Sequence, residues 1–319
     1  MTTPKYRKNL PLLDGRRFLT DGGLETVLIF NEGFELPLFA AFTLLKDQKG
    51  VAAIKRYFAK FCDIARTNGT GFILDTPTWR ASKRWADELG YSDVALRAAH
   101  EDAVTLMNEI RDANETETTP YIVNGVVGPN DDGYNPNSFM TAKEAENYHA
   151  TQIAYLDSSG VDMITALTMT YVEEAIGIAK AARARNIPCV ISFTVETDGR
   201  LPSGQTLKDA IQQVDIETDN APIYFMINCA HPDHFVDAIA NNESWLERIR
   251  GVRANASRMS HEELDNSEEL DNGDPQELGN DVVGLTELLP NLTVFGGCCG
   301  TDHRHIEAMA RSCRHEHAA

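Results

Sequence analysis

Three of the six cysteines stand where an apolar segment meets residues that bend the backbone. Cys229 is followed by Ala230-His231-Pro232, and the adjacent Cys298 and Cys299 are framed by glycines. A cysteine pair between glycines buries little apolar surface, so packing in a core does not explain it. Zinc prefers thiolate ligands, and three protein ligands leave the fourth tetrahedral position open, as in catalytic zinc sites. The sequence therefore predicts a Zn2+ ion held by Cys229, Cys298 and Cys299.

A substrate thiol can occupy the open position of such a site. Zinc then holds it as a thiolate near neutral pH, whereas a free thiol has a pKa of about 8.5. A thiolate attacks the methyl group of a sulfonium or ammonium compound without further activation. The predicted activity is methyl transfer from such a donor to a zinc-activated thiol, and no catalytic residue is required beyond that thiol.

The other three cysteines, Cys62, Cys189 and Cys313, lie in apolar helix or strand patterns, so we expect them in the core. Disulfides are not expected in a cytosolic chain of this size. A different class stays open, a non-catalytic zinc-binding or redox-sensing protein. A disulfide between Cys298 and Cys299 would mark that class, because adjacent thiols oxidise readily once zinc leaves.

The segments that must position the cysteines alternate between two hydrophobic patterns. Eight short apolar runs are typical of parallel strands buried on both faces. They cover residues 18–23, 71–79, 121–128, 161–169, 188–195, 222–230, 252–257 and 292–297. Helical patterns cover residues 51–65, 94–106, 141–156 and 172–186, and two further helices follow the N-cap candidates Asp274 and Thr301 or Asp302.

Eight strands that alternate with helices predict a single (β/α)8 barrel over residues 1–319, with an acidic loop insertion at about residues 258–273. An open doubly wound sheet is the rival. The first strand is not followed by a Gly-x-Gly-x-x-Gly motif, which disfavours a dinucleotide-binding version of that sheet. Active sites of such barrels lie at the C-terminal ends of the strands, where closure would bring the three cysteines together. We interpret the acidic residues of the insertion as a solvated loop that aids solubility, and the sequence leaves open whether this loop closes over the site as a lid or packs against a neighbouring chain.

The overall composition restricts the partners. The chain of 319 residues has a formal net charge of −19, which disfavours binding to the phosphate backbone of nucleic acid. No apolar run approaches the roughly 18 residues that span a membrane, and the apolar residues 10–13 are too few for a signal peptide. We expect a cytoplasmic protein whose partners are a small-molecule thiol acceptor and a methyl donor. The sequence leaves open whether the protein is a homo-oligomer.

At these residues the sequence resembles the homocysteine S-methyltransferase family, over nearly the whole chain. The shared stretches are residues 20–23, 125–129, 192–194, 228–229 and 296–301, and the last two match the family's zinc ligands in order and strand placement. The resemblance implies a (β/α)8 barrel, one Zn2+ ion and methyl transfer to the sulfur of homocysteine, which gives methionine. The donors that it implies include S-methylmethionine, S-adenosylmethionine, betaine and methylfolate.

The resemblance also implies residues that bind the substrate. Asp21 and Gly22 are expected at the floor of the site, and an aspartate at a strand end is itself suited to an ammonium group. Trp79 stands where the family usually has another aromatic residue, such as tyrosine. Asn228 is expected to contact the substrate side of the site, where it either orients the adjacent Cys229 or bonds to backbone at its strand end.

One departure from the family concerns the acceptor. Members usually carry Phe-Glu-Thr after strand four, with a glutamate that holds the amino group of the substrate, but Leu167 takes its place here. Either another acid, Glu25 or Glu196, replaces it, or the enzyme is a related barrel methyltransferase that acts on a different thiol or methylated sulfur compound. Arg80 suits the carboxylate of an acid-bearing thiol, with a surface ion pair as the alternative.

The histidines are not expected to bind metal. His303, His305, His315 and His317 cluster near the C-terminus, where we predict solvated side chains. His231 and His234 follow Cys229 and are predicted to be loop residues, with an approach of His231 to the metal or substrate as the alternative.

Overall fold

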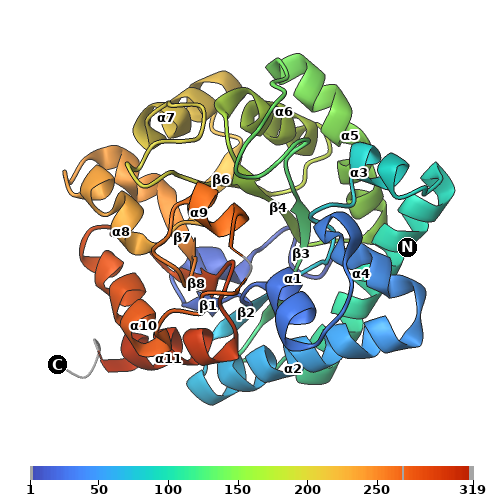
Figure 1. Ribbon diagram of the computed structural model, residues 1–319, viewed down its shortest axis with the longest axis horizontal. Helices are drawn as coiled ribbons and strands as arrows, with labels where there is room; N and C mark the ends of the chain where they lie inside the picture. Colours follow the sequence, from blue (N-terminus) through green and yellow to red (C-terminus); the bar gives the residue numbers. More distant parts are fainter. Residues whose placement is uncertain (1–2, 268, 316–319) are drawn as a thin grey trace.

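The computed structural model describes residues 3–267 and 269–315. Eight parallel strands form a closed barrel in which each strand pairs with the next one along the chain, and β1 pairs with β8 (Figure 1). The strands are β1 (Phe18–Leu19), β2 (Gly71–Asp75), β3 (Tyr121–Val127), β4 (Met163–Met169), β5 (Cys189–Phe193), β6 (Pro222–Asn228), β7 (Ile249–Ala254) and β8 (Val294–Gly297). The predicted (β/α)8 barrel is confirmed, and the pairing of β1 with β8 excludes an open sheet.

All eight predicted strands are present, and most end earlier than predicted. The difference is largest at residues 20–23 and 76–79, which follow β1 and β2 at the mouth of the barrel. The prediction for β7 was displaced, because this strand begins at Ile249 and not at residue 252. Arg250 and Gly251 interrupt the apolar run at that point, which hides the start of the strand.

Helices surround the barrel. The longer ones are α2 (Gln48–Asn68), α4 (Asp93–Asn114), α5 (Ala142–Ser159), α6 (Val172–Arg183), α7 (Leu207–Thr218), α10 (Pro275–Gly284) and α11 (His303–His315). Shorter helices lie in the connections: α1 (Leu24–Thr26), α3 (Lys83–Glu88), α8 (Pro232–Phe235) and α9 (His261–Asp265). The predicted helices are confirmed, whereas α7 was not predicted although Thr206 caps it and its apolar residues follow helical spacing.

The predicted helix caps rest on specific hydrogen bonds. The side chain of Asp274 accepts from the backbone N–H groups of Gln276 and Glu277, which starts α10. Of the two candidates before α11, Asp302 accepts from the backbone N–H of Arg304 at 2.9 Å. Thr301 instead donates to the carbonyl of Cys298 at 2.7 Å, so it belongs to the loop that carries the cysteines.

The interior of the barrel changes from apolar to polar along its axis. Toward the N-terminal ends of the strands, one apolar cluster unites Leu10, Leu12, Phe18, Ile73, Ile122, Met163, Val190, Tyr224, Met226 and Val294. Such filling by strand side chains is usual in barrels of this class. Toward the other end, Asn124 donates to Asp75 at 2.6 Å and accepts from Thr165 at 3.0 Å. Apolar side chains therefore fill the barrel at the N-terminal ends of its strands, and the interior is polar toward the C-terminal ends.

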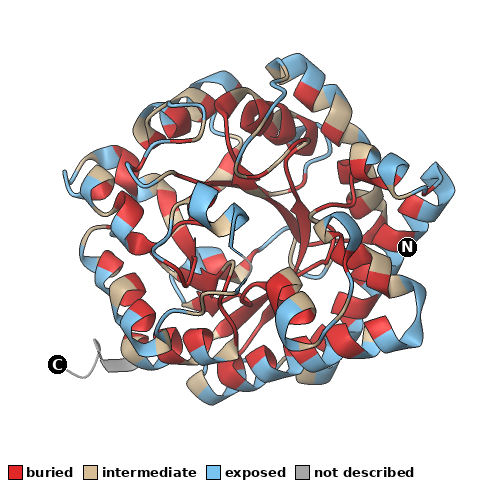
Figure 2. Ribbon diagram, in the orientation of Figure 1, coloured by how far each residue is buried: buried red, intermediate tan, exposed pale blue. Residues whose placement is uncertain are grey.

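A second and larger apolar core lies between the barrel and the helices. Figure 2 shows buried residues along the strands and on the inner faces of the helices, with exposed residues on the outer faces. Cys62, Cys189 and Cys313 belong to this core, as predicted. Their burial among apolar side chains separates them from the three cysteines at the mouth.

The acidic segment at residues 258–273 contains α9, which lies over the barrel mouth inside the ring of longer helices (Figure 1). Ser260 and Glu263 form a capping box that starts α9. Within the described ranges, no helix is long and apolar enough to cross a membrane.

The prediction of solvated histidines near the C-terminus was wrong for His305. This side chain is 0 % exposed, and its Nε2 lies 2.8 Å from the carbonyl oxygen of Asn272. It therefore connects α11 to the end of the acidic segment. His303 is partly exposed, whereas His317 and the side chain of His315 lie outside the described residues.

Candidate metal and substrate site

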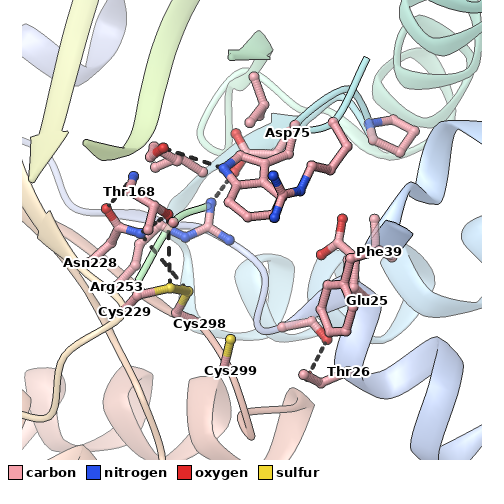
Figure 3. Close-up of a pocket in the computed structure, with 18 of the residues that line it drawn as sticks. Glu25, Thr26, Phe39, Asp75, Thr168, Asn228, Cys229, Arg253, Cys298 and Cys299 are labelled. Carbon is pink, nitrogen blue, oxygen red and sulfur yellow. Dashed lines mark hydrogen bonds and ion pairs between the residues drawn. A yellow bond between two sulfur atoms is a disulfide. The ribbon is translucent and has the colours of Figure 1, made fainter. Parts of the chain in front are cut away.

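A cavity of about 570 Å3 opens at the C-terminal ends of the strands (Figure 3). Its walls come from the loops after β1, β2 and β3, from the C-terminal ends of β4, β6, β7 and β8, and from Asp265 of α9. All the predicted site residues line this one cavity: Asp21, Gly22, Trp79, Asn228, Cys229, Cys298 and Cys299. The barrel thus brings together residues that lie up to 278 positions apart in the sequence, from 21 to 299.

The sulfur atoms of Cys229, Cys298 and Cys299 lie within 4.8 Å of one another. Cys229 follows β6 directly, and the other two follow β8. Cys229 and Cys298 are joined by a disulfide, whereas Cys299 is not bridged. The expectation that no cysteine is bridged was therefore wrong for this pair. Their Cα atoms are 5.3 Å apart, which is within the reach of a disulfide.

The backbone at Cys229 has a conformation that is unusual for a residue with a side chain. Its φ is +54°, in the left-handed region. Its carbonyl oxygen accepts from Asn255 Nδ2 at 3.0 Å and lies 2.8 Å from His261 Nε2. Non-glycine residues hold such conformations where their surroundings fix them, which is common at functional sites. The conformation turns the Cys229 sulfur toward the cysteines after β8.

The glycines around Cys298 and Cys299 allow the backbone segments to approach closely. A Cβ atom on Gly23 would lie 2.6 Å from the carbonyl oxygen of Cys298. Gly300 has a φ of +77°, which favours glycine. The predicted role of glycine in presenting the adjacent cysteines therefore has a direct structural basis.

Asn228 links three strands beneath the sulfur atoms. Its Oδ1 accepts from the backbone N–H of Thr168 at 2.9 Å and from the hydroxyl of Ser192 at 2.6 Å. Its Nδ2 donates to Thr168 Oγ1 at 2.9 Å and reaches Cys298 Sγ at 3.9 Å. The amide thus bonds to backbone, which is one of the two alternatives, and the sulfur that it reaches is that of Cys298 and not that of the adjacent Cys229.

Two further residues hold the cysteines from above, and the sequence did not single them out. The hydroxyl of Tyr134 donates to Cys299 Sγ at 3.3 Å, and the Tyr134 ring stacks on His261 at 4.0 Å between centroids. His261 belongs to α9, so the acidic segment and the loop after β3 meet over the sulfurs. Tyr134 could have been noticed as an aromatic residue in a loop at the active face. Its contact with Cys299 could not be predicted, because the two residues lie far apart in sequence.

An ionic cluster that the sequence did not predict lies at the floor of the cavity. Arg253 donates to Asp21 at 2.7 Å and also to Asp75, while the Tyr57 hydroxyl donates to the second oxygen of Asp21 at 3.0 Å. All four side chains are buried. Burial raises the pKa of Asp21 above its usual range, and Arg253 opposes this shift. A charged residue inside the apolar run of β7 was the signal that could have identified Arg253.

Trp79 and Leu167, the two departures from the family pattern, contact each other. The indole Nε1 of Trp79 donates to the carbonyl oxygen of Leu167 at 3.3 Å. Both residues line the cavity, so the position of the usual glutamate is filled by an apolar side chain beside an aromatic one.

The two acids proposed as substitutes for that glutamate have different positions. Glu25 lines the cavity opposite the cysteines (Figure 3). Burial raises the pKa of Glu25 to about 6. Glu196 does not line the cavity, and its Oε1 lies 3.0 Å from Nδ1 of His261. Glu25 is therefore the better placed acid for a ligand.

His231 and His234 do not line the cavity. Nδ1 of His231 accepts from the backbone N–H of Asp233 at 3.2 Å, which caps α8. Burial lowers the pKa of His231 to about 4. His234 lies 2.9 Å from the carbonyl oxygen of Arg258 through its Nε2. His231 directly precedes α8, as expected of a loop residue, whereas His234 lies within α8, so the loop prediction was wrong for His234.

The three cysteines fit a zinc ion once the disulfide is reduced. Sulfur ligands of one tetrahedral zinc lie about 2.3 Å from the ion, so their mutual distances fall within the observed separation. Three sulfur donors beside a cavity leave room for a fourth ligand from a substrate. The donor set therefore suits a catalytic site better than a closed structural one.

Comparison with known proteins identifies the family of the chain and proteins that share its fold. The model of the homocysteine S-methyltransferase family matches residues 18–313. The structure is similar to crystal structures of the homocysteine methyltransferase MmuM from Escherichia coli. The oxidized form has a TM-score of 0.75 and 17% identity, with 96% of this chain and 99% of that chain covered. The metallated form has a TM-score of 0.74 and 18% identity, with the same coverage.

At this level of identity, the structural similarity shows a shared fold. The match of the family model shows more, because it covers residues 18–313, which include the three cysteines at the mouth of the barrel. The chain belongs to the homocysteine S-methyltransferase family and is an enzyme of the methyltransferase class.

Proposed function

We propose that this protein is a zinc-dependent S-methyltransferase that moves a methyl group from a sulfonium or ammonium donor to homocysteine, with methionine as the product. The observation that carries this proposal is the meeting of three cysteine sulfurs within 4.8 Å at the floor of the cavity. Membership of the family supports the reaction, and a metallated form of MmuM supports a metal in this fold. The proposal implies a cytoplasmic role in methionine biosynthesis.

Zinc on Cys229, Cys298 and Cys299 would supply one chemical effect, a lowered pKa of the acceptor thiol, so that the nucleophile is a thiolate. In the transfer, a new sulfur–carbon bond forms while the carbon–sulfur or carbon–nitrogen bond of the cationic donor breaks. The donor leaves as a neutral sulfide or amine, and no proton has to move in this step. The reaction therefore needs no general acid or base from the chain.

The chain's own residues would position the reactants and exclude water. Asn228 and Tyr134 fix the sulfurs of Cys298 and Cys299 from opposite sides. The apolar side chains of Leu36, Phe39 and Trp79 line the cavity, and a thiolate in such surroundings is poorly hydrated and more reactive. The acidic segment closes one side through α9, so we assign it the role of a cover.

The substrate contacts form a separate part of the proposal. We place the amino-acid part of the acceptor along Gly22 and Trp79, with its ammonium group toward Glu25. Both oxygens of Asp21 already accept hydrogen bonds from Arg253 and Tyr57. We therefore assign Asp21 the role of holding Arg253 at the floor of the cavity.

A second candidate has a specific observation in its favour. Leu167 presents no carboxylate where the family holds the substrate amino group, and two arginines, Arg80 and Arg253, line the same cavity. A thiol without an ammonium group would suit this charge pattern. The candidate is a related methyltransferase that acts on another thiol or methylated sulfur compound.

The test is methyl transfer by the reduced, zinc-supplied protein. Homocysteine is offered with S-methylmethionine, S-adenosylmethionine, betaine or methylfolate, and methionine is quantified. Cys299→Ser should abolish turnover, whereas Cys62→Ser, a core cysteine, should retain it. Turnover that survives in Cys299→Ser would refute the proposed site. Turnover with another thiol but not with homocysteine would select the second candidate.

A further inference from the structure

We propose that Arg80 binds the carboxylate group of a substrate in the cavity. This inference rests on the proposed methyl transfer, because it names the chemistry of a ligand for the same cavity. It adds a substrate-binding residue that is not one of the cysteines.

Arg80 is held in a fixed orientation by two tryptophans. Its side chain lines the cavity although the residue is only 7 % exposed. The guanidinium carbon lies 4.4 Å from the ring centroid of Trp79 and 3.8 Å from that of Trp85. Contacts with both indole rings restrict the guanidinium group before any ligand binds, which reduces the entropic cost of binding.

The hydrogen bonds of Arg80 leave one edge of the guanidinium group available. Nη1 donates to the carbonyl oxygen of Asp131 at 3.0 Å. Nη2 lies 3.7 Å from the carboxylate of Asp132, which is too far for a hydrogen bond. Nε is buried and has no hydrogen-bond partner among the described residues. Since Nε and Nη2 share one edge, that edge can bind a carboxylate through two parallel N–H···O bonds.

The surrounding charges do not satisfy this edge. The Asp132 side chain is 45 % exposed, its Oδ1 accepts from the backbone N–H groups of Tyr134 and Asn135, and its contact with Arg80 Nη2 is long. Burial lowers the pKa of Arg80 to about 10, so the group remains charged at neutral pH. A buried arginine with an unpaired donor is costly unless an acceptor arrives. A ligand carboxylate is the acceptor whose shape and charge match this edge.

The position of Arg80 also relates to the missing glutamate. Trp79, which stacks on Arg80, donates to the carbonyl oxygen of Leu167. The wall of the cavity on which Leu167 replaces the family's glutamate therefore carries a cationic side chain, that of Arg80. Recognition on this wall changes from the cationic end of a ligand to its anionic end.

The carboxylate can belong to either reactant, because both the acceptor thiol and the methyl donor can carry one. Two matched ligand pairs separate these sources. The acceptor pair is 4-mercaptobutanoate and 4-mercaptobutan-1-ol. The donor pair is betaine and choline. Within each pair, a carboxylate is replaced by a hydroxymethyl group while the reacting end stays the same.

The experiment measures dissociation constants of all four ligands by calorimetry on the full chain, reduced and supplied with zinc. The test variant is Arg80→Met, which keeps an apolar chain between the tryptophans but removes the charge and the donors. The matched control is Arg84→Met. Arg84 pairs with Asp131 at 2.9 Å and lies 5.2 Å from the Trp85 ring, but it does not line the cavity.

We expect Arg80→Met to weaken the carboxylate member of one pair about 10- to 100-fold and to leave its hydroxymethyl partner within about 2-fold. A selective loss in the acceptor pair places the carboxylate on the thiol, and one in the donor pair places it on the donor. Equal changes within both pairs, or no change, would overturn the proposal. Arg84→Met should leave the ratio of the two dissociation constants unchanged within each ligand pair.

A second variant keeps the test valid if Arg80→Met does not fold. Asp132→Asn removes the acid that competes for Nη2, so it should tighten the carboxylate ligand of the same pair. Unchanged or weaker binding of that ligand would count against the proposal. All these ratios are binding measurements, so an absence of methyl transfer would refute the proposed function without altering their interpretation.

Discussion

The hydroxyl group of Tyr134 donates a hydrogen bond to the sulfur of Cys299 across 3.3 Å. The ring of Tyr134 stacks on His261, which in turn lies 2.8 Å from the carbonyl oxygen of Cys229. Two segments that lie far from the cysteines in sequence, the loop after β3 and the acidic segment, therefore fix the sulfurs at the mouth.

Tyr134→Phe should weaken zinc binding about 10-fold while the cysteines stay in place, because groups that bond to metal ligands typically affect affinity by 10- to 100-fold. The affinity is measured by competition with a chromogenic chelator on reduced protein. Tyr171→Phe is the matched control, since Tyr171 is a buried tyrosine whose hydroxyl accepts from the backbone of Met140. An unchanged affinity in Tyr134→Phe would show that the bond does not tune the site.

The disulfide between Cys229 and Cys298 should exclude zinc, because a bridged sulfur is not a thiolate ligand. In oxidised, denatured protein an alkylating reagent should modify four of the six cysteines, and after reduction all six. Zinc uptake should appear only in the reduced sample. A full equivalent of zinc in protein with four reactive cysteines would contradict this interpretation of the site.

Arg253 should be essential for stability. Its removal leaves Asp21 and Asp75 as buried carboxylates without their cation, which typically costs about 3–5 kcal/mol. Urea unfolding of Arg253→Met measures this loss. Arg56→Met, which breaks an exposed pair with Glu32, should have little effect. A loss no larger in Arg253→Met than in the control would show that the cluster is not a structural requirement.

Glu25 should make stability depend on pH. Burial raises its pKa from the ordinary value of 4.5 to about 6, so the folded state binds the proton more tightly than the unfolded state. The resulting stabilisation is complete below about pH 4.5 and is lost as the pH rises through 6, by up to about 2 kcal/mol. Arg253 and Arg80 oppose the shift, and Asp75 adds to it.

Glu25→Gln should flatten this decrease in unfolding free energy between pH 4 and pH 7, measured by urea titration at each pH. The control is Glu35→Gln, which alters an exposed acid. Its unfolding free energy should change with pH as steeply as that of the unmodified protein. If Glu25→Gln keeps that slope, the pH dependence arises from another group, for which Asp21 is the alternative because burial raises its pKa in the same direction.

The barrel could be predicted because buried parallel strands produce short apolar runs. Cys298 and Cys299 could be predicted as a site because the glycines on both sides of the pair disfavour a packing role, and Cys229 because it ends another apolar run at the same face. The cluster of Asp21, Asp75 and Arg253 could not be predicted, since its members come from the loop after β1, from β2 and from β7, and each is an ordinary polar residue in sequence. Their pairing follows from the register of the closed barrel alone.

His305 and the disulfide show the same limit. A histidine near the end of a chain resembles a solvated residue, and only the packing of α11 against the acidic segment buries it. The bridge between Cys229 and Cys298 joins residues 69 positions apart, on strands that are not neighbours in the sheet. The burial of His305 and the bridging of Cys229 and Cys298 both depend on contacts that form only once the barrel has closed.

The most direct test of the central claim measures zinc content and methionine formation on one sample of freshly reduced protein. The account predicts one zinc ion per chain and transfer of a methyl group to homocysteine from at least one cationic donor. It also predicts that Cys299→Ser loses both together. Reduced protein that binds no zinc, or that turns over equally well after the metal is removed by a chelator, would contradict the account.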